Sequence, residues 1–202
     1  MNDSKEHIIL IASRLFLQKS FKEVTMKEIV EKTGLSKGAF YHYFDSKEQL
    51  FCEVLDYFFQ SVSRNYENYS KESFYQFYND YIKETISLTK NYLDKFENEL
   101  SEISLTMNYF SLIFDALKLY PEFREKVIEG FNQEINYWIK AIERAREKGE
   151  IKTTMTDKEI AETFMYLSDG VGMHMIMRGV DIENVVKPFQ ILWDRLYEQM
   201  KV

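Results

Sequence analysis

A row of polar side chains between residues 37 and 42 has the chemistry needed to read a DNA groove. A lysine binds a phosphate or a guanine edge, a hydroxyl and an imidazole exchange hydrogen bonds with bases, and a residue without Cβ allows close approach. The row consists of Lys37, Gly38, Tyr41 and His42. Phe40 and Phe44 are four residues apart and share another face. The pattern predicts a helix that buries its aromatic side and presents its polar side.

Gly38 is the member of this row that most needs an explanation. Glycine inside a helix costs about 1 kcal/mol relative to alanine, so closeness to a binding partner would account for it. An alternative stays open, in which Gly38 is a tolerated first-turn residue and its polar neighbours are ordinary solvated surface. The capping signals on either side of the row favour DNA contact.

Two helix starts and one helix stop surround the row. Thr25 is placed to cap a first helix, and Glu28 three residues later completes a capping box. Gly34 suits the left-handed conformation that ends this helix, and Ser36 is placed to cap the next one. Two short helices joined by a tight turn are the signature of a helix-turn-helix.

A third start signal follows the row. Asp45 and Ser46 end one helix and begin another, and Gln49 completes a second capping box. Lys47 then lies in the first turn, where free N–H groups and the positive end of the helix dipole favour a phosphate. We therefore predict a contact between Lys47 and the DNA backbone.

The run from Phe16 to Phe51, with its TxxxI, TGLSKGAFYHYF and SKEQLF segments, resembles the DNA-binding domain of the TetR family of bacterial one-component repressors. It covers the first quarter of the chain and shows no departure from the family pattern. The resemblance implies an all-helical homodimer that binds a pseudo-palindromic operator and releases it when a small molecule enters a larger domain. By position it implies DNA contacts at Thr25, Ser36, Lys37, Gly38, Tyr41, His42 and Lys47. Repression is the family habit, and activation stays open.

Composition supports an all-α fold. The 202 residues include two prolines and seven glycines, and this scarcity of breakers favours helices throughout. We expect an N-terminal three-helix DNA-binding domain over residues 1–47 and a larger helical domain for ligand binding and dimerisation over residues 48–202. Cys52 is the single cysteine, and no signal peptide or membrane-spanning run is visible. We expect a cytoplasmic protein that makes no membrane contact.

Charge is distributed unevenly along the chain. The net charge is −7, which argues at first against nucleic acid as a partner. However, residues 1–50 carry eight Lys or Arg against seven Asp or Glu, so the acidic excess lies in the remainder. The larger domain would then repel DNA from the wrong surface, and a few placed contacts would matter more than a general basic field.

The larger domain is rich in aromatic residues and methionine, which line adaptable apolar cavities. We expect one helix over residues 100–119 to lie at its centre, because apolar residues surround it. Most of these side chains should be core, and His174 is better explained as a satisfied or partly exposed helix residue than as a ligand. The candidate effector-binding residues are Met107, Phe110, Phe114, Trp138, Met165 and His174. They suit an apolar or aromatic effector, and aromatic faces would also accept a cation.

The last two helices are the predicted homodimer interface. The penultimate helix carries a second row beside its core-facing one, formed by Ala161, Met165, Ser168, Gly172 and Ile176. Small residues in this row would let a helix of a second copy approach and form a four-helix bundle. The alternative is that both rows pack inside the chain's own core.

No constellation of residues predicts an enzyme. The three histidines, His7, His42 and His174, lie far apart in the sequence, and no metal-binding cluster, phosphate loop or nucleophile motif is present. We expect no cofactor and no metal. The remaining alternative to a regulator is a helical ligand-binding or interaction protein that does not bind DNA.

Overall fold

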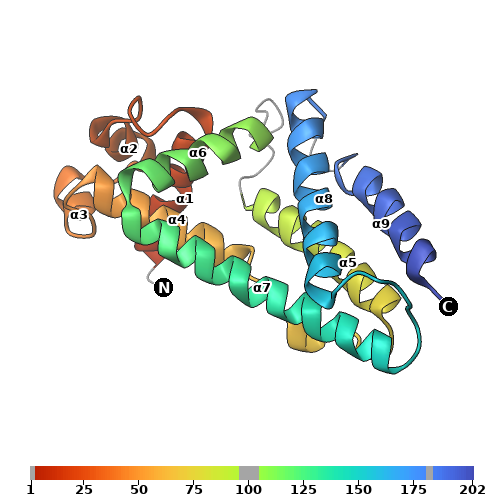
Figure 1. Cartoon of the computed structure of the whole chain (residues 1–202). Helices are drawn as coiled ribbons and strands as arrows, with labels where there is room; N and C mark the ends of the chain where they lie inside the picture. The colour runs from red at the N-terminus through yellow and green to blue at the C-terminus, as the bar shows by residue number, and fades with distance from the viewer. Residues whose placement is uncertain (1–2, 96–104, 181–183) are drawn as a thin grey trace. The chain divides into compact units, whose positions relative to one another are not determined.

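The structure, a computed structural model, describes residues 3–95, 105–180 and 184–202. Within these ranges the regular structure is helical, apart from one isolated antiparallel bridge between Ile151 and Lys201. The all-α fold class is confirmed. The helices are α1 (Asp3–Gln18), α2 (Met26–Thr33), α3 (Lys37–Tyr41), α4 (Lys47–Ser61), the 3-10 helix η1 (Tyr66–Asn68), α5 (Phe74–Asp94), α6 (Leu105–Leu119), α7 (Pro121–Glu147), α8 (Asp157–Met177) and α9 (Val186–Met200) (Figure 1).

The chain divides into two compact units. Unit 1 comprises Met1–Ser63 and Leu88–Tyr120, and unit 2 comprises Arg64–Ser87 and Pro121–Val202. The division therefore passes through α5. The boundary expected after residue 47 separates functions rather than compact units, and it stays a prediction.

Unit 1 is built around α1, whose apolar side is buried as its periodicity predicted. Ile8 and Ala12 are fully buried, and α1 packs against α2, α4 and α6. The rings of Phe16, Phe21 and Phe51 form one cluster with centroids 4.7 to 5.9 Å apart. Because these rings come from α1, the connection after it and α4, the cluster fixes the base on which the helix-turn-helix stands.

The place of α6 corrects one expectation from the sequence. We expected the apolar segment 100–119 at the centre of the larger domain, and its first residues lie outside the described ranges. The described helix instead belongs to unit 1, where the Asp115 carboxylate accepts a hydrogen bond of 3.1 Å from the backbone N–H of Phe21. Phe114 is 49% exposed, so α6 is not buried on every side.

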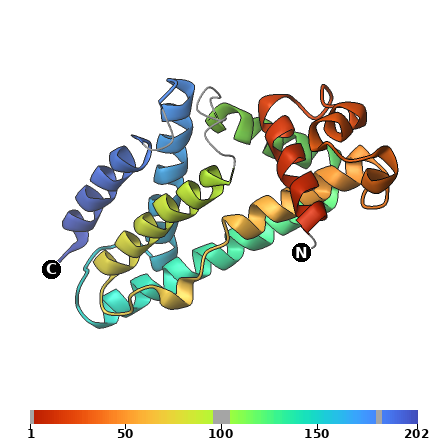
Figure 2. The same ribbon diagram turned by 180° about the vertical axis from the view of Figure 1, so that it is seen from behind.

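Unit 2 has an aromatic core supplied by α5, α7, α8 and α9. Trp138 and Trp193 are fully buried with ring centroids 5.2 Å apart, and the Trp193 indole donates a 2.8 Å hydrogen bond to the Phe164 carbonyl. α7 packs against α8, and α8 packs against α9 (Figures 1 and 2). Helical periodicity predicted these buried faces.

The segment after α7 caps the beginning of α5. The Glu150 carboxylate accepts hydrogen bonds from the backbone N–H groups of Phe74 at 2.9 Å and Tyr75 at 3.1 Å. It also accepts one of 3.0 Å from the Tyr197 hydroxyl of α9. One side chain therefore satisfies two helix-start donors and joins three parts of unit 2.

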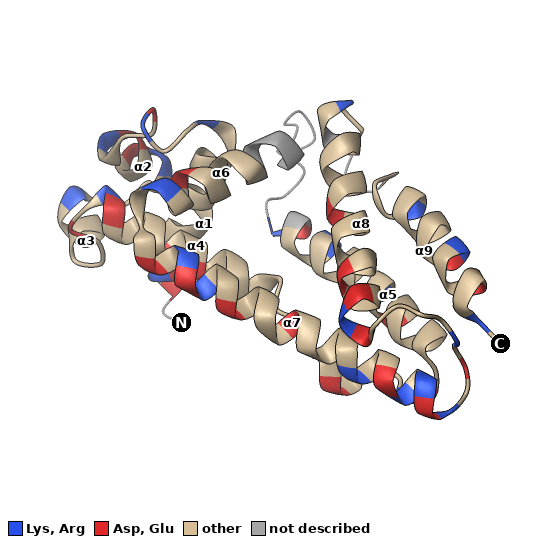
Figure 3. Ribbon diagram, viewed as in Figure 1, with Lys and Arg blue, Asp and Glu red and all other residues tan. Residues whose placement is uncertain are grey.

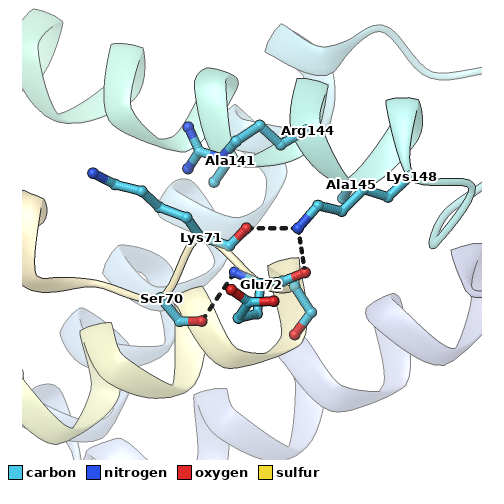
Figure 4. A pocket seen from close by; sticks show the side chains of 8 residues that line it. Ser70, Lys71, Glu72, Ala141, Arg144, Ala145 and Lys148 are labelled. Atoms are coloured by element: carbon cyan, nitrogen blue, oxygen red, sulfur yellow. Dashed lines mark hydrogen bonds between the residues drawn. The ribbon is translucent and has the colours of Figure 1, made fainter.

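A small pocket beside this cap is lined by α7 and the residues just before α5 (Figure 4). The Lys148 ammonium donates hydrogen bonds of 2.9 Å to the carbonyls of Lys71 and Glu72. These contacts bind the two walls of the pocket together, so we treat it as a structural seam.

Candidate nucleic-acid interface

The two helices of the helix-turn-helix begin and end where the capping signals predicted. The Thr25 hydroxyl accepts a 3.2 Å hydrogen bond from the backbone N–H of Glu28, and the Ser36 hydroxyl accepts one of 3.2 Å from that of Ala39. Gly34 ends α2 with a φ of 66°, in the left-handed region that favours glycine. These three residues set the turn and therefore the direction of α3.

The capping boxes differ in detail from the expected geometry. The Glu28 carboxylate pairs with Lys19 of the connection before α2, so it serves the loop. Gln49 does reach back, and its side-chain oxygen accepts a 2.9 Å hydrogen bond from the backbone N–H of Asp45 while Ser46 caps α4. A second-box residue can thus bind one position earlier than the cap itself.

The short helix α3 separates its faces as predicted. Phe40 and Phe44 are fully buried, which anchors the helix and the turn that follows it. Thr25, Ser36, Lys37, Gly38, Tyr41 and His42 are all exposed. The Lys37 ammonium lies 5.9 Å from the centre of the Tyr41 ring. The structure therefore brings six of the seven predicted DNA-contacting residues to the surface around α3.

Packing inside the chain does not explain Gly38. A Cβ built at this position would meet no atom within 4 Å outside its own helix backbone, and the φ angle is not in the left-handed region. An alanine would fit and would favour the helix. The reason for glycine must lie in something that approaches α3 from outside, or in chance.

Lys47 is the exception among the seven residues. It is half-buried, and its ammonium donates hydrogen bonds of 2.8 Å to the carbonyls of Phe21 and Val24. The same ammonium lies 4.3 Å from the centre of the Phe21 ring. Lys47 therefore ties the α1–α2 connection to the start of α4, and its contact with DNA stays a prediction.

Charge around the helix-turn-helix is mixed in sign. Figure 3 shows basic and acidic residues interspersed on α1 to α4, in line with the near-balance of residues 1–50. Such a surface attracts DNA weakly at long range, so binding must depend on particular contacts such as those of α3.

The predicted effector residues do not form one set in the structure. Phe110 and Phe114 stack at 6.2 Å in unit 1, whereas Trp138 and Met165 belong to the core of unit 2. His174 is exposed on α8. The sixth residue, Met107, lies in α6 with a side chain outside those described. A single pocket made from all six residues stays a prediction.

The second row of α8 faces largely inward. Ala161 is fully buried and Met165 is 9% exposed, both within the core of unit 2. A Cβ at Gly172 would lie 3.9 Å from Val185 of the same chain. The expected partner-facing row is therefore wrong for these three positions, because the segment before α9 and the core cover them. The side chain of Ile176 lies outside those described.

Other residues of α8 and α9 are exposed and apolar. Tyr166 is 63% exposed and Met177 is 73% exposed on α8. Ile191 and Leu192 on α9 are 52% and 43% exposed. Sequence periodicity did not single them out, because an exposed apolar position has no periodic signature of its own.

The sequence also missed a cluster of polar side chains around Arg64. The stretch from 65 to 70 was expected only to turn the chain. It forms η1, and its tyrosines pack against α5 and α7, with Tyr66 stacked on Tyr137 at 4.6 Å. The unusual density of tyrosines in this stretch was the only available signal.

Two searches of the described ranges gave no candidate. No group of three or more His, Cys, Asp or Glu side chains there is arranged to hold a metal ion. Among the described helices, none combines the length and apolarity needed to cross a bilayer.

The N-terminal geometry and the helical fold define a helix-turn-helix protein with a larger helical body. The sequence model described as bacterial regulatory proteins of the tetR family matches residues 8–54. A crystal structure of a TetR-family transcriptional regulator from Agrobacterium tumefaciens superposes with a TM-score of 0.67, covering 98% of each chain at 16% identity. The chain belongs to the TetR family.

Two relatives extend the sequence similarity. The uncharacterized helix-turn-helix-type transcriptional regulator YerO of Bacillus subtilis is 47% identical over 58 residues, which are 29% of this chain and 20% of YerO. The helix-turn-helix-type transcriptional regulator QacR of Staphylococcus aureus is 30% identical over 140 residues, covering 68% of this chain and 65% of QacR. The chain thus spans about a fifth of the length of YerO and under two thirds of that of QacR.

Proposed function

We propose that this protein is a transcriptional repressor that binds a pseudo-palindromic DNA operator as a homodimer and leaves it when a small molecule binds unit 2. The observation that carries the proposal is the exposed row on α3. Lys37, Tyr41 and His42 are free to contact a groove, while Phe40 and Phe44 hold the helix from behind. A second-helix arrangement of this kind is suited to the major groove.

Two-fold symmetry gives the pair of α3 helices a defined task. Recognition helices of a dimer bind half-sites separated by one helical turn of DNA, about 34 to 36 Å, or by multiples of it. The exposed apolar residues of α8 and α9 support an interface through the last two helices. The operator should accordingly be an inverted repeat.

Release by an effector is an energetic requirement on unit 2. A ligand that moves a two-state equilibrium from 1:99 to 99:1 must bind one state about 10⁴-fold more tightly than the other. The effector must therefore make contacts in the released state that the DNA-bound state lacks. We assign no catalytic role to the chain.

The proposal is tested by measuring binding to DNA upstream of its own gene at several salt concentrations. We expect a specific complex whose affinity falls with salt, and Tyr41→Ala should weaken it by about tenfold to 100-fold. Lys37→Ala should lower the salt slope by about one unit. Lys83→Ala removes the same charge from an exposed position of α5 and serves as the matched control.

A second candidate function is a helical ligand-binding or interaction protein without DNA binding. The half-buried Lys47, already bonded to two carbonyls, favours it slightly because one expected phosphate contact is engaged within the protein. Equal affinity of the wild type, Tyr41→Ala and Lys37→Ala for every inverted repeat tried would support this alternative and contradict the regulator.

A further inference from the structure

Arg64 of unit 2 is a cation enclosed by tyrosines. Its guanidinium carbon lies 3.9 Å from the centre of the Tyr81 ring, and its Nη1 atom is buried without a hydrogen-bond partner among the described residues. Burial opposes the charge, but Tyr81, Tyr66, Tyr69 and Glu134 outweigh it, so the pKa of Arg64 is raised. The side chain is therefore a fixed positive charge on an aromatic face.

The rings around this guanidinium come from three elements. Tyr66 of η1 stacks on Tyr137 of α7 with centroids 4.6 Å apart and planes 11° from parallel. Tyr69 lies 5.0 Å from Tyr66, and Tyr81 of α5 lies 5.2 Å from Trp138. Such an assembly of aromatic faces is a general way to hold an organic cation.

Two polar atoms on α7 share this cluster and lack partners. Glu134 Oε1 is buried with no hydrogen bond, and so is the indole Nε1 of the fully buried Trp138. These residues are four apart and therefore face the same side of the helix. Buried polar atoms in native proteins almost always have a partner. An acceptor and two donors left unpaired in one cluster indicate a molecule that supplies what the chain does not.

The charge of the cluster favours a cation as that molecule. Glu134 and Glu84 supply two carboxylates near the single guanidinium, and Glu84 accepts a hydrogen bond from Tyr69. Asp169 of α8 is an exposed residue, yet desolvation of its carboxyl and then the charge of Glu134 raise its pKa to about 6. At neutral pH it adds a further negative charge.

Arg64 also occupies a significant place in the chain. It is the third residue after Ser61, the last residue of α4. A ligand that displaces the guanidinium from Tyr81 therefore acts on the segment that leaves α4, the helix whose start Lys47 ties to the α1–α2 connection. This sequence connection gives effector binding a covalent route toward the helix-turn-helix.

We propose that the Arg64 cage, defined as Arg64 with Tyr66, Tyr69, Tyr81 and Glu134, is the effector site, and that a planar organic cation displaces the Arg64 guanidinium and pairs with Glu134. The inference rests on the proposed function, because an effector requires a regulator. The ligand class is an aryl guanidinium or amidinium, whose flat charge matches that of the arginine it replaces and whose N–H groups suit the Glu134 carboxylate.

The ligand class is tested by calorimetric titration of the full-length protein without DNA. Phenylguanidinium is the probe, and phenylurea, of similar shape without the charge, is its control. We expect phenylguanidinium to bind at least about tenfold more tightly than phenylurea. Glu134→Gln should weaken phenylguanidinium by about tenfold or more, because a charge-assisted hydrogen bond is lost. Glu143→Gln, the same change at an exposed position of α7, should bind as the wild type does.

Displacement is tested with Arg64→Ala. Removing the resident guanidinium should tighten phenylguanidinium by about tenfold. Ethylguanidinium, which is the end of the arginine side chain as a free ion, should raise the thermal unfolding midpoint of Arg64→Ala but not of the wild type, and ethylurea should raise neither. If ethylguanidinium rescues Arg64→Ala while phenylguanidinium fails to bind the wild type, the cage is only an internal contact and the proposal is wrong.

The role as effector is tested separately on the DNA complex. We expect phenylguanidinium to dissociate the wild-type complex and to act about tenfold more weakly on Glu134→Gln. Binding without dissociation would overturn the effector assignment and leave the DNA-binding function intact. Absence of any specific DNA complex, with cation binding present, would instead refute the proposed function and with it the effector role.

Discussion

At the scale of single residues, two lysines ten positions apart have different tasks. Lys37 projects from α3 into solvent, whereas the ammonium of Lys47 donates to the carbonyls of Phe21 and Val24. Both were expected to contact DNA because both follow a helix start. Their surroundings separate a side chain that is available to a partner from one that the fold already uses.

Lys47→Met should therefore destabilise the protein. We expect the free energy of unfolding to fall by about 1 to 3 kcal/mol, because two hydrogen bonds from a charged donor are lost and two carbonyls lose a partner. Denaturant unfolding followed by circular dichroism measures the change. Lys22→Met, in the same connection but exposed, should stay within about 0.5 kcal/mol of the wild type. Unchanged stability of Lys47→Met with weakened operator binding would restore Lys47 to the DNA contacts.

At the scale of elements, local capping decides where the helices of the head begin. Thr25, Ser36 and Ser46 each accept a backbone hydrogen bond at a helix start. In unit 2 the start of α5 is capped from a distance, since Glu150 lies 75 to 76 residues away from the two N–H groups it accepts. Local caps can be found in a sequence, and a distant cap cannot.

Glu150→Ala tests the distant cap. We expect a loss of about 2 kcal/mol or more, because the change removes the partner of two helix-start donors together with that of the Tyr197 hydroxyl. Thermal unfolding measures the loss. Glu147→Ala, at an exposed position in the last turn of α7, is the matched control. Similar melting of both variants would mean that water replaces Glu150 without cost.

At the scale of the whole molecule, the exposed apolar residues of α8 and α9 are the basis for the proposed dimer. Exposed leucine and isoleucine side chains gain free energy when a second copy covers them. The small-residue row of α8 cannot serve this purpose where it is buried in its own core. The proposed interface therefore uses faces other than the one expected from the sequence.

Ile191→Glu combined with Leu192→Glu should yield a monomer. Sedimentation at concentrations where the wild type is dimeric measures the effect, and the loss of one half-site contact should weaken operator binding by at least about 100-fold. Ile86→Glu, at a 51% exposed position of α5, is the control for added charge. A dimer that survives the double change would move the interface elsewhere.

The sequence predicted those parts of the molecule that local chemistry determines. The helix-turn-helix, its caps and the buried aromatic faces follow from residue type and periodicity over a few turns. The position of α6 and the engagement of Lys47 depend on Asp115 and Phe21, which are distant along the chain from one another. Long-range pairing of this kind leaves no periodic signal, and for the same reason the Arg64 cage was not predicted.

The paired indoles in the core of unit 2 have a practical consequence. Trp138 and Trp193 are the only two tryptophans, and they lie edge to face in one buried cluster. Selective excitation of indole emission would therefore observe the body of the protein and remain blind to the head. Since Tyr81 contacts both indoles, a molecule that disturbs that tyrosine should alter their colour and brightness without any added dye.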